Sequence, residues 1–559
     1  MDMNQIKDEQ LLQDKKDLNK FGYAQELLRS MGGFSNFAIS FSIISILTGA
    51  VSLYGHGLTY GGPGMMGYGW PLVALFVLLI AAALAELASA IPTAGALYHW
   101  ASVLANKRWG WYTAWINLIG QIGIVAGIDY SAALFADPLL SDVFGYTSTD
   151  TTILITFIVI LLTHGICNHI GIRMVARLND FSAWYHIVIA AGLVVTLALF
   201  TKSDLQPVSY LFKVGETFSD KPYAFAFLIG LLQAQWTFTG YDASAHTIEE
   251  TVNPRIRAPW GIFTSVAYSF VFGFIMLAFV TLSIQDAGAA TAADNAFIYV
   301  ISEALGGTFG KIILWLITLA MWFCGLSSIT SFSRMMYAFS RDKGMPLSRH
   351  WAEISKKYRT PAKAIWLSVA LSFLLAFIDY MIKIINPDAA YGTLVFLTAV
   401  SVVGLYVAYG IPIFLKLLAQ RKGLFQPKHL GPWNLGKYSN IVAVLSLVWI
   451  VFISVIMMIP PNQNAAYAML GMMLILVIMD FTYYRKHFKG PPGCASDLHG
   501  GPPAKRTGIG AELRPGNGLC HNSIVYLHTF PAELSSACCC GWRIFVSNCR
   551  DLADYFIAA

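Results

Sequence analysis

Hydrophobic residues occur in long blocks separated by short polar stretches, and this pattern predicts membrane-spanning helices. Each block has roughly twenty or more residues with almost no charged side chain, which is the length needed to cross about 30 Å of hydrocarbon. Only closed hydrogen-bonding elements survive in lipid, and blocks this long must be helices rather than barrel strands. We therefore expect an all-α integral membrane protein with about twelve transmembrane helices. The predicted spans are 34–56, 71–101, 109–136, 151–171, 181–201, 223–248, 259–284, 310–340, 363–386, 391–418, 440–460 and 464–484.

The composition agrees with residence in a lipid bilayer. Of the 559 residues, 56% are hydrophobic and 12% are charged, and a soluble protein carries about twice that charged fraction. The net charge of +6 does not indicate nucleic-acid binding, because Lys and Arg lie in short clusters between the apolar blocks. No cleavable signal peptide is visible in the polar first thirty residues, and we expect no cofactor.

The distribution of Lys and Arg among the loops predicts the orientation. Loops after spans two, four and six contain basic clusters at 107–108, 173–177 and 255–257, and the loops after spans eight and ten are also basic. Loops after spans one, three, seven and eleven contain almost no Lys or Arg. Since an excess of Lys and Arg marks cytoplasmic loops, we expect both termini in the cytoplasm. The plasma membrane is the expected location, because no organelle-targeting segment is present.

Three regions differ in composition. Residues 1–33 are polar and are expected to form a cytoplasmic N-terminal segment, and residues 34–487 contain the twelve predicted spans. Residues 488–559 are rich in Gly and Pro at first, contain scattered Cys and have no block of span length. Their composition predicts a disordered or loosely attached tail; a reading-frame artefact is the alternative.

Two spans contain a glycine flanked by hydroxyl residues near the middle of the apolar block. Gly49 follows Thr48 in the first span, and Gly240 follows Thr239 in the sixth. An unwound helix leaves peptide groups free to replace the hydration shell of a polar solute. The alternative is that these glycines only permit close helix packing. Because the two positions stand five spans apart, as an inverted repeat of five plus five helices requires, we expect both helices to be broken.

Few ionisable residues lie within the spans. Such residues are costly in hydrocarbon and usually face a cavity or mark an ion path. The deepest acids are Glu86 and Asp242, whereas Asp129 and Asp379 lie nearer to span ends and are expected at the membrane interface. The remaining ionisable residues of the spans are His186 and His246.

Neither a metal site nor a catalytic motif is predicted. His164, Cys167 and His169 have the ligand types that suit zinc, but no second cluster completes a four-ligand site. The chain contains no GxSxG or HExxH motif and no paired catalytic aspartates. We therefore do not expect an intramembrane enzyme.

Three motifs resemble the amino acid–polyamine–organocation superfamily, and within it the amino acid/choline transporter branch, which includes permeases for γ-aminobutyrate. The first motif is 236–242 with 249–259, which resembles the sixth span and its following loop. The second motif is 86–100, and the third is 340–346. The similarity covers roughly residues 20–487. It implies a LeuT-like fold of two inverted five-helix repeats plus two extra helices. In that fold, spans one and six unwind around the substrate, and spans three, eight and ten help to line the site.

The resemblance implies a secondary active transporter, or permease, that moves a small amino acid or γ-aminobutyrate-like solute by alternating access. The half-helix after Gly49 would offer free N–H groups to a carboxylate. Unpaired carbonyls in 46–48 and 238–240 would suit an ammonium. The candidate substrate-binding residues are Thr48, Gly49, Ala50, Val51, Trp236, Phe238, Thr239, Gly240 and Tyr241.

Transport against a gradient needs a coupled proton, a sodium ion or an exchanged solute, and we favour proton coupling or exchange. His186 aligns with a basic fifth-span position of proton-coupled relatives and titrates near neutral pH; the alternative is a neutral packing histidine. Asp242 could relay a proton or attract a cationic solute, or could instead bond to a freed helix end. Ser327 and Ser328 could hold sodium.

Residues for a gate can also be named. Trp236 matches the position of a gating aromatic residue in the family. Glu249 and Arg257, with Glu250 beside them, could form an inner-gate ion pair. A solvated surface cluster is the alternative for these charged residues.

Two other functions stay open. A transporter of an organic cation, such as choline, ethanolamine or a polyamine, would need an aromatic cage, to which Trp236, Phe238, Tyr241 and Trp184 could contribute. A transporter-like nutrient sensor would need a long ordered cytoplasmic extension. We expect the partners to be a small-molecule substrate, the lipid bilayer and a coupling proton or sodium ion.

Overall fold

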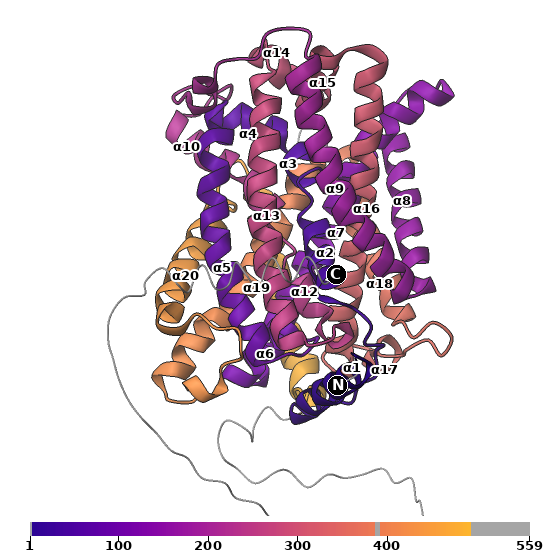
Figure 1. Cartoon of the computed structure of the whole chain (residues 1–559), viewed down its shortest axis with the longest axis vertical. Helices are drawn as coiled ribbons and strands as arrows, with labels where there is room; N and C mark the ends of the chain where they lie inside the picture. Colours follow the sequence, from indigo (N-terminus) through magenta and orange to yellow (C-terminus); the bar gives the residue numbers. More distant parts are fainter. Residues whose placement is uncertain (1–2, 386–391, 493–559) are drawn as a thin grey trace, which may run out of the picture. The chain divides into compact units, whose positions relative to one another are not determined.

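Long apolar helices run side by side through the part of the chain that the computed structural model describes, residues 3–385 and 392–492 (Figure 1). Within these residues, 11 helical stretches are long and apolar enough to cross a membrane. They match every predicted span except the sixth, so the all-α prediction is confirmed. The long helices are α2 Gly33–Ile44 continued by α3 Gly49–Ser52, α5 Trp70–Ala90, α7 Lys107–Phe144, α8 Asp150–Ile170, α9 Ile172–Phe200, α13 Pro254–Leu282, α16 Gly307–Arg341, α18 Ala362–Ile385, α19 Thr393–Arg421, α20 Ser439–Ile456 and α21 Gln463–Met479.

Shorter helices connect these elements or lie at the ends of the bundle. They are α1 Met3–Lys20, α4 Tyr54–Gly61, α6 Ala96–Leu104, α10 Tyr223–Gly230, α11 Leu232–Thr237, α12 Ala243–His246, α14 Ala287–Ala292, α15 Ala296–Leu305, α17 Ser348–Trp351 and α22 Arg485–His487. The predicted second span, 71–101, is two helices, α5 and α6. The chain leaves the helix at Ile91 because Pro92 follows, and proline cannot donate a helical hydrogen bond.

The sixth segment crosses the bundle in pieces. The N–H of Gln206 donates to the carbonyl of Leu282 at 2.7 Å, so residue 206 lies beside the end of α13. Helix α13 has 29 residues, which correspond to about 43 Å at 1.5 Å per residue. The chain must therefore return past the length of α13 before α13 begins, and α10, α11 and α12 make that crossing. This discontinuous segment is the predicted sixth span, 223–248, and together with the 11 stretches above it accounts for all twelve predicted spans.

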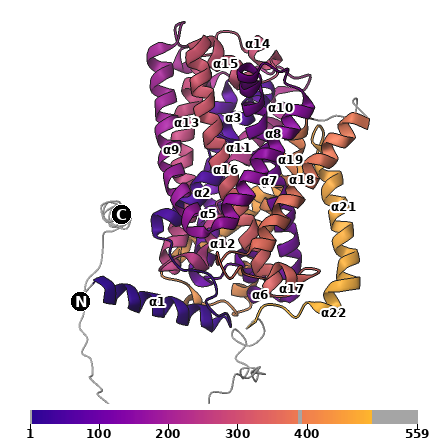
Figure 2. The same cartoon turned by 90° about the vertical axis from the view of Figure 1, so that its right-hand side faces the viewer.

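Helix α7 is the central helix of the bundle. It packs against α6, α16 and α19, and 89% of the residues in its most apolar stretch of 18 are buried. In α21, which stands at the edge of the bundle in Figure 2, only 22% of the residues in the corresponding 18-residue stretch are buried. The polar positions that matter for a solute are therefore on α7 and its neighbours, while α21 presents apolar side chains outward.

The polar N-terminal segment contains a helix, α1. Helix α1 lies across one end of the bundle (Figure 2), where the Asp14 carboxylate accepts a hydrogen bond of 2.9 Å from the N–H of Asn253. We call this end the α1 end. The predicted C-terminal tail, 488–559, falls outside the described residues from 493 onward.

Candidate functional site

The first and sixth segments are both broken, and the breaks touch. Helix α2 ends at Ile44 and α3 begins at Gly49, while α11 ends at Thr237 and α12 begins at Ala243. A Cβ atom on Gly49 would lie 2.6 Å from the Cα of Thr237, so only glycine permits this approach. Gly240 has φ +84°, a left-handed conformation that favours glycine. The predicted breaks at these two glycines are confirmed.

A small cavity lies between the two breaks. It has a volume of about 10 Å³, measured as the space open to the centre of a water molecule, which is roughly enough for one water. Helix α7 supplies the wall opposite the two breaks. The lining residues are Ile43, Ile44, Thr48, Gly49, Ile124, Ile128, Trp236, Thr237 and Thr239.

Several peptide groups of the first break have no partner in the backbone. The N–H groups of Thr48 and Gly49 both donate to the carbonyl of Ser45, at 2.8 and 2.9 Å. The next N–H that bonds is that of Ser52, to Thr48 at 2.8 Å. Among the described residues, no acceptor faces the N–H groups of Ala50 and Val51, which lie in the first turn of α3. The break therefore leaves donors free beside the cavity.

Helix α19 holds the second break open. The Tyr406 hydroxyl donates to the carbonyl of Phe238 at 2.9 Å, and the N–H of Gly240 donates to the Tyr409 hydroxyl at 3.3 Å. Buried peptide groups without partners are costly, and these two tyrosines replace the missing helical bonds. This role could not be predicted from the sequence, because a tyrosine in an apolar block also suits ordinary packing.

Four of the nine predicted substrate residues line the cavity: Thr48, Gly49, Trp236 and Thr239. The indole N–H of Trp236 is buried and has no hydrogen-bond partner among the described residues. The other five predicted residues are next to the cavity but face elsewhere. They are Ala50, Val51, Phe238, Gly240 and Tyr241.

The contacts of two of these residues explain their orientation. The ring of Phe238 packs on Trp70 at 4.6 Å between centroids, and the ring of Tyr241 packs on Tyr409 at 5.0 Å. Trp184 is 55% exposed and stacks on Phe34 at the outer surface. The aromatic cage that an organic cation would need is therefore not assembled, since only Trp236 of the four candidates reaches the cavity.

His186 contacts the first break directly. Its Nε2 lies 2.7 Å from the Ser45 hydroxyl, which lies 2.6 Å from the Thr48 hydroxyl. Its Nδ1 lies 2.8 Å from the carbonyl of Ser182, one turn earlier in α9. The ring is buried and joins the fifth span to a residue that lines the cavity.

The two serines proposed for sodium make other contacts. Ser327 donates to the Asn179 side chain at 2.8 Å, and Ser328 donates to the carbonyl of Cys324, in its own helix, at 2.9 Å. It is the Cys324 thiol that reaches the first segment, donating to the carbonyl of Ile43 at 3.2 Å. Neither serine hydroxyl bonds to the first break.

Asp242 lies in a buried polar network beside the second break. Its carboxylate accepts a hydrogen bond of 2.8 Å from the Tyr409 hydroxyl and lies 3.1 Å from His246 Nε2. The Gln121 amide of α7 is 3.5 Å away, and the Asn117 amide is 3.4 Å from the same histidine nitrogen. The network links the sixth, third and tenth spans, and it includes Tyr409, which also supports the break.

Two other acids lie in different surroundings from those expected. Asp129 is fully buried in the middle of α7, with Oδ2 at 3.1 Å from His164 Nδ1, so the prediction of an interfacial position is wrong. Glu86 does not face the cavity, because it forms a buried ion pair with Lys416 and accepts a 2.7 Å bond from Ser439. Lys416 is accordingly inside α19 rather than in the basic loop that follows it.

Buried ion pairs join the end of the sixth segment to α16 at the α1 end. Glu249 forms a bidentate pair with Arg341, at 2.9 and 3.0 Å, and accepts a 3.1 Å bond from the N–H of Ala94. Arg257 is not its partner, because that guanidinium donates to the carbonyl of Val252 at 3.3 Å. Glu250 lies 3.5 Å from Arg334. We call these four residues, Glu249, Glu250, Arg334 and Arg341, the ion-pair cluster.

The two carboxylates of the cluster differ in their electrostatics. Burial raises the pKa of Glu249, but the Arg341 guanidinium and the Ala94 N–H outweigh it, so the pKa lies below its usual value. Burial also raises the pKa of Glu250, and Arg334 offsets only part of that effect. Both side chains are fully buried, which excludes a solvated surface cluster.

The chain preceding α2 covers this cluster. The N–H groups of Ser30 and Met31 both donate to the carbonyl of Glu250 at 2.9 Å, and Arg29 donates to the carbonyls of Ile248 and Thr251. Arg341 also lies over the ring of Tyr23, at 4.0 Å from its centroid. The segment before α2 therefore covers the ion-pair cluster at the α1 end.

Comparison with known proteins shows the family to which the chain belongs. The family model described as amino acid permease matches residues 31–479. The chain belongs to the amino acid permease family. The permease is 34% identical to Amino-acid permease BAT1 of Arabidopsis thaliana over 465 residues, which are 79% of this chain and 88% of the plant protein.

Two further relatives cover most of their own length. The permease is 32% identical to Amino-acid permease BAT1 homolog of Oryza sativa over 504 residues, 85% of this chain and 94% of the rice protein. It is 29% identical to GABA-specific permease of Saccharomyces cerevisiae over 519 residues, 89% of each chain. The described residues contain no group of three metal-ligating side chains.

Proposed function

We propose that this permease is a secondary active transporter of a small amino acid or a γ-aminobutyrate-like solute, working by alternating access in the plasma membrane. The observation that carries the proposal is the contact between the two breaks, which encloses a cavity with free peptide donors beside it. A solute carboxylate would accept from the N–H groups of Ala50 and Val51. The printed names of relatives, one a GABA-specific permease, support this substrate class.

The walls of the cavity set the size and polarity of the solute. Four isoleucines, Ile43, Ile44, Ile124 and Ile128, provide an apolar lining that suits a short carbon chain. Thr48, Thr239 and the unpaired Trp236 N–H provide the polar contacts. A volume near that of one water requires the breaks to move apart before a solute binds, as alternating access demands.

For coupling, we propose that His186 carries the proton. Its side chain is titratable near neutral pH and bonds to the first break through Ser45, so a change in its charge acts on the residues that line the cavity. The network of Asp242, His246 and Tyr409 offers a second titratable group at the other break. Sodium coordination by Ser327 and Ser328 is less well supported, because both hydroxyls bond elsewhere.

The ion-pair cluster is proposed as the inner gate, with the α1 end and both termini in the cytoplasm. Basic residues are concentrated in the loops at this end, as the positive-inside rule requires for a cytoplasmic face. The cluster is closed over the cavity, so its ion pairs must break each time the solute leaves to this side.

Uptake by the purified protein in proteoliposomes tests the proposed function. Radiolabelled amino acids, γ-aminobutyrate and choline are supplied with a pH gradient, a sodium gradient or neither. We expect accumulation of an amino acid under an inward proton gradient or by exchange. The Trp236→Leu variant should lose most of this uptake, whereas Trp449→Leu, in a buried tryptophan that stacks on Phe76 away from the cavity, should not. Accumulation of choline alone would contradict the proposal.

A further inference from the structure

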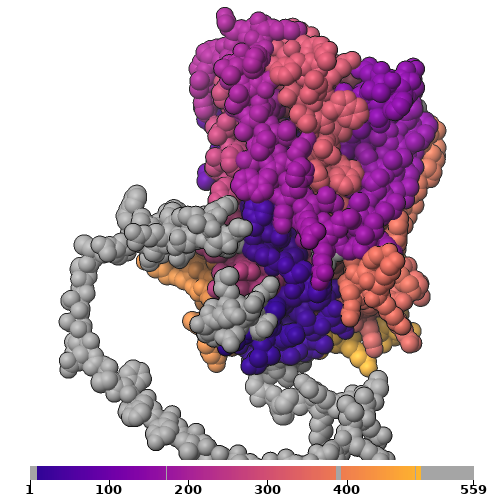
Figure 3. Space-filling model, turned by 45° about the vertical axis from the view of Figure 1, so that its right-hand side comes forward, coloured from indigo at the N-terminus to yellow at the C-terminus, as the bar shows by residue number. Residues whose placement is uncertain are grey.

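A second, larger pocket opens at the α1 end, outside the bundle core. It has a volume of about 750 Å³, measured in the same way as the central cavity. Three parts of the chain that are far apart in the sequence form it: the segment before α2, the junction of α8 and α9, and the loop before α18 (Figure 3). The lining residues are Leu28, Ile170, Gly171, Arg173, Met174, Arg177, Leu178, Lys357, Tyr358 and Arg359.

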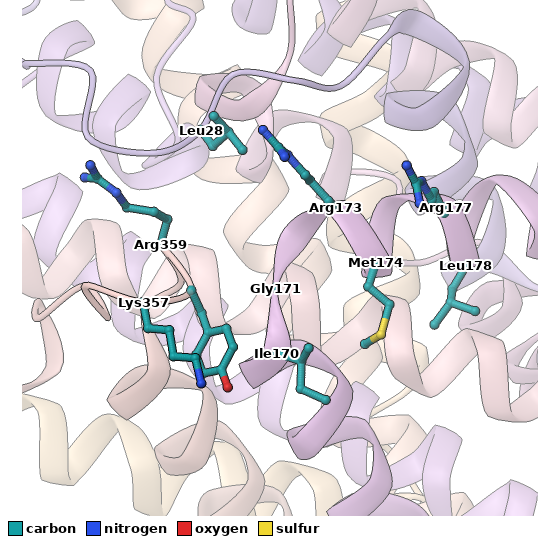
Figure 4. Close-up of a pocket in the computed structure, with 10 residues that line it drawn as sticks. Leu28, Ile170, Gly171, Arg173, Met174, Arg177, Leu178, Lys357 and Arg359 are labelled. Atoms are coloured by element: carbon teal, nitrogen blue, oxygen red, sulfur yellow. The ribbon is translucent and has the colours of Figure 1, made fainter.

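Four of the ten lining residues are cations, and none is an acid. Figure 4 shows Arg173 and Arg177 on α9 at one side of the pocket, and Lys357 and Arg359 on the opposite side. Within residues 3–385 and 392–492, no carboxylate pairs with any of these four side chains. Lys357 Nζ lies over the Tyr358 ring, 4.9 Å from its centroid. Four like charges facing one space without counter-ions favour an anionic ligand.

The floor of the pocket is apolar and continues onto the outer surface of the helices. Ile170 is 45% exposed, and Ile166, one turn earlier in α8, is 50% exposed. On α9, Phe181 lies one turn beyond Arg177 and is 55% exposed. Residues three or four apart share one face of a helix. The basic pocket is thus joined to a strip of side chains that would contact acyl chains in a membrane.

We propose that this pocket binds the phosphate of an anionic phospholipid, with the headgroup between the four cations and an acyl chain along α8 and α9. Arg guanidinium groups match phosphate oxygens in bidentate geometry, and basic pockets between membrane helices on the cytoplasmic side suit anionic headgroups. The position fits, because α8, which is long and apolar enough to cross a membrane, ends at Ile170 beside the pocket. The ligand class stands independently of which solute the central cavity carries. A soluble phosphate ester shares the headgroup chemistry but would leave the apolar strip uncovered.

Lipid binding to the full-length protein tests the proposal. The purified, delipidated protein in detergent is titrated with phosphatidylserine or phosphatidylcholine, and bound lipid is counted by native mass spectrometry. Near a membrane surface each Lys or Arg contributes about a fivefold gain in affinity. We therefore expect phosphatidylserine binding to fall about fivefold in Arg177→Gln and more than about a hundredfold when the four cations of the pocket are replaced by Gln, with phosphatidylcholine binding unchanged.

The matched control removes four exposed cations from the same end of the bundle. These are Arg421, Lys422, Lys428 and Lys437, of which Lys437 also lies over a tyrosine ring. Their replacement by Gln should change phosphatidylserine affinity less than about twofold. An equal loss of phosphatidylserine affinity in this control would show general attraction to surface charge and would contradict a specific lipid site in the pocket. Unchanged phosphatidylserine binding in the variant that lacks the four pocket cations would also contradict such a site. If that variant unfolds, Arg177→Gln decides.

A second arm separates the lipid from a soluble anion. Inorganic phosphate and glycerophosphoserine are added at millimolar concentration to the protein with bound phosphatidylserine. We expect neither to displace the lipid, because neither covers the apolar strip. Displacement of the lipid by inorganic phosphate, together with retention of phosphate in native spectra, would contradict a lipid site and indicate a free-anion site.

Discussion

Removal of the Glu249 charge should open the α1 end of the permease. In the Glu249→Gln variant, the Arg341 guanidinium loses a bidentate ionic partner at 2.9 and 3.0 Å. Glu249 is fully buried and the Arg341 side chain is 13% exposed, so water cannot replace the lost contact in the closed state. Breaking a buried pair of this kind costs about 3–5 kcal/mol.

The lower end of that range applies here. Gln can still accept from the Ala94 N–H, and Arg341 keeps its contact with the Tyr23 ring. A loss of about 3 kcal/mol from the closed state raises the open population about a hundredfold.

Cys324 reports on this opening, since its buried thiol bonds to the carbonyl of Ile43 at the first break. With the other cysteines replaced by serine, its alkylation from the cytoplasmic side should be about a hundredfold faster in Glu249→Gln. The control is Glu353→Gln, which removes the same charge from an exposed pair with Lys363. The double variant Glu249→Gln/Arg341→Gln should open less than the single one, because it leaves no buried guanidinium without its partner. Unchanged alkylation in a folded Glu249→Gln protein would refute the gate.

The Glu249–Arg341 pair should be insensitive to mild acid. The folded pKa of Glu249 is below its usual value, so the ionised form stabilises the closed state above the ordinary pKa. That stabilisation is lost only as the pH falls through the lowered folded pKa. The folded pKa of Glu250 is raised instead, so any acceleration of Cys324 alkylation between neutral pH and about pH 5.5, more than one unit above an ordinary Glu pKa, should come from Glu250 and be absent from Glu250→Gln. A marked acceleration in that range in Glu250→Gln would contradict the assignment.

Two further substitutions test the cavity and the coupling. Gly49→Ala puts a Cβ 2.6 Å from the Cα of Thr237. This overpacking costs about 1–3 kcal/mol and should abolish uptake. The control Gly192→Ala, with nothing within 4 Å of its Cβ, should leave uptake intact. His186→Ala should remove the pH dependence of uptake, whereas His56→Gln, in a histidine that bonds to the carbonyl of Ile229 and packs on the Tyr60 ring, should preserve it. Normal uptake in Gly49→Ala, or an unaltered pH profile in His186→Ala, would exclude the corresponding role.

The membrane helices and the two breaks could be predicted from the sequence for physical reasons. The bilayer forces apolar blocks of span length, and eleven of them are helices at the expected places. Gly49 and Gly240 carry a signal because glycine beside hydroxyl residues is costly in a continuous helix unless the backbone needs it. Pro92, which ends α5, carries a comparable signal in the predicted second span that the apolar pattern obscured.

The partners of these elements could not be predicted, because they depend on tertiary contacts. Ile124 and Ile128 line the cavity, but an isoleucine in an apolar block gives no sign of facing a solute. The partner of Glu249 is 92 residues away at Arg341, and the nearer Arg257 was the obvious choice on sequence distance. The predicted third span ends at residue 136, which puts Asp129 near its end. Helix α7 instead extends to Phe144, eight residues further, so Asp129 lies well inside the helix.

The structure of the permease with an amino acid bound, determined by cryo-electron microscopy in lipid nanodiscs, tests the central claim most directly. We predict solute density between residues 48–51 and 236–239, with its carboxylate on the N–H groups of α3 and its carbon chain against the α7 isoleucines. Density at any other position, or a first and sixth helix that run unbroken past that density, would contradict the account.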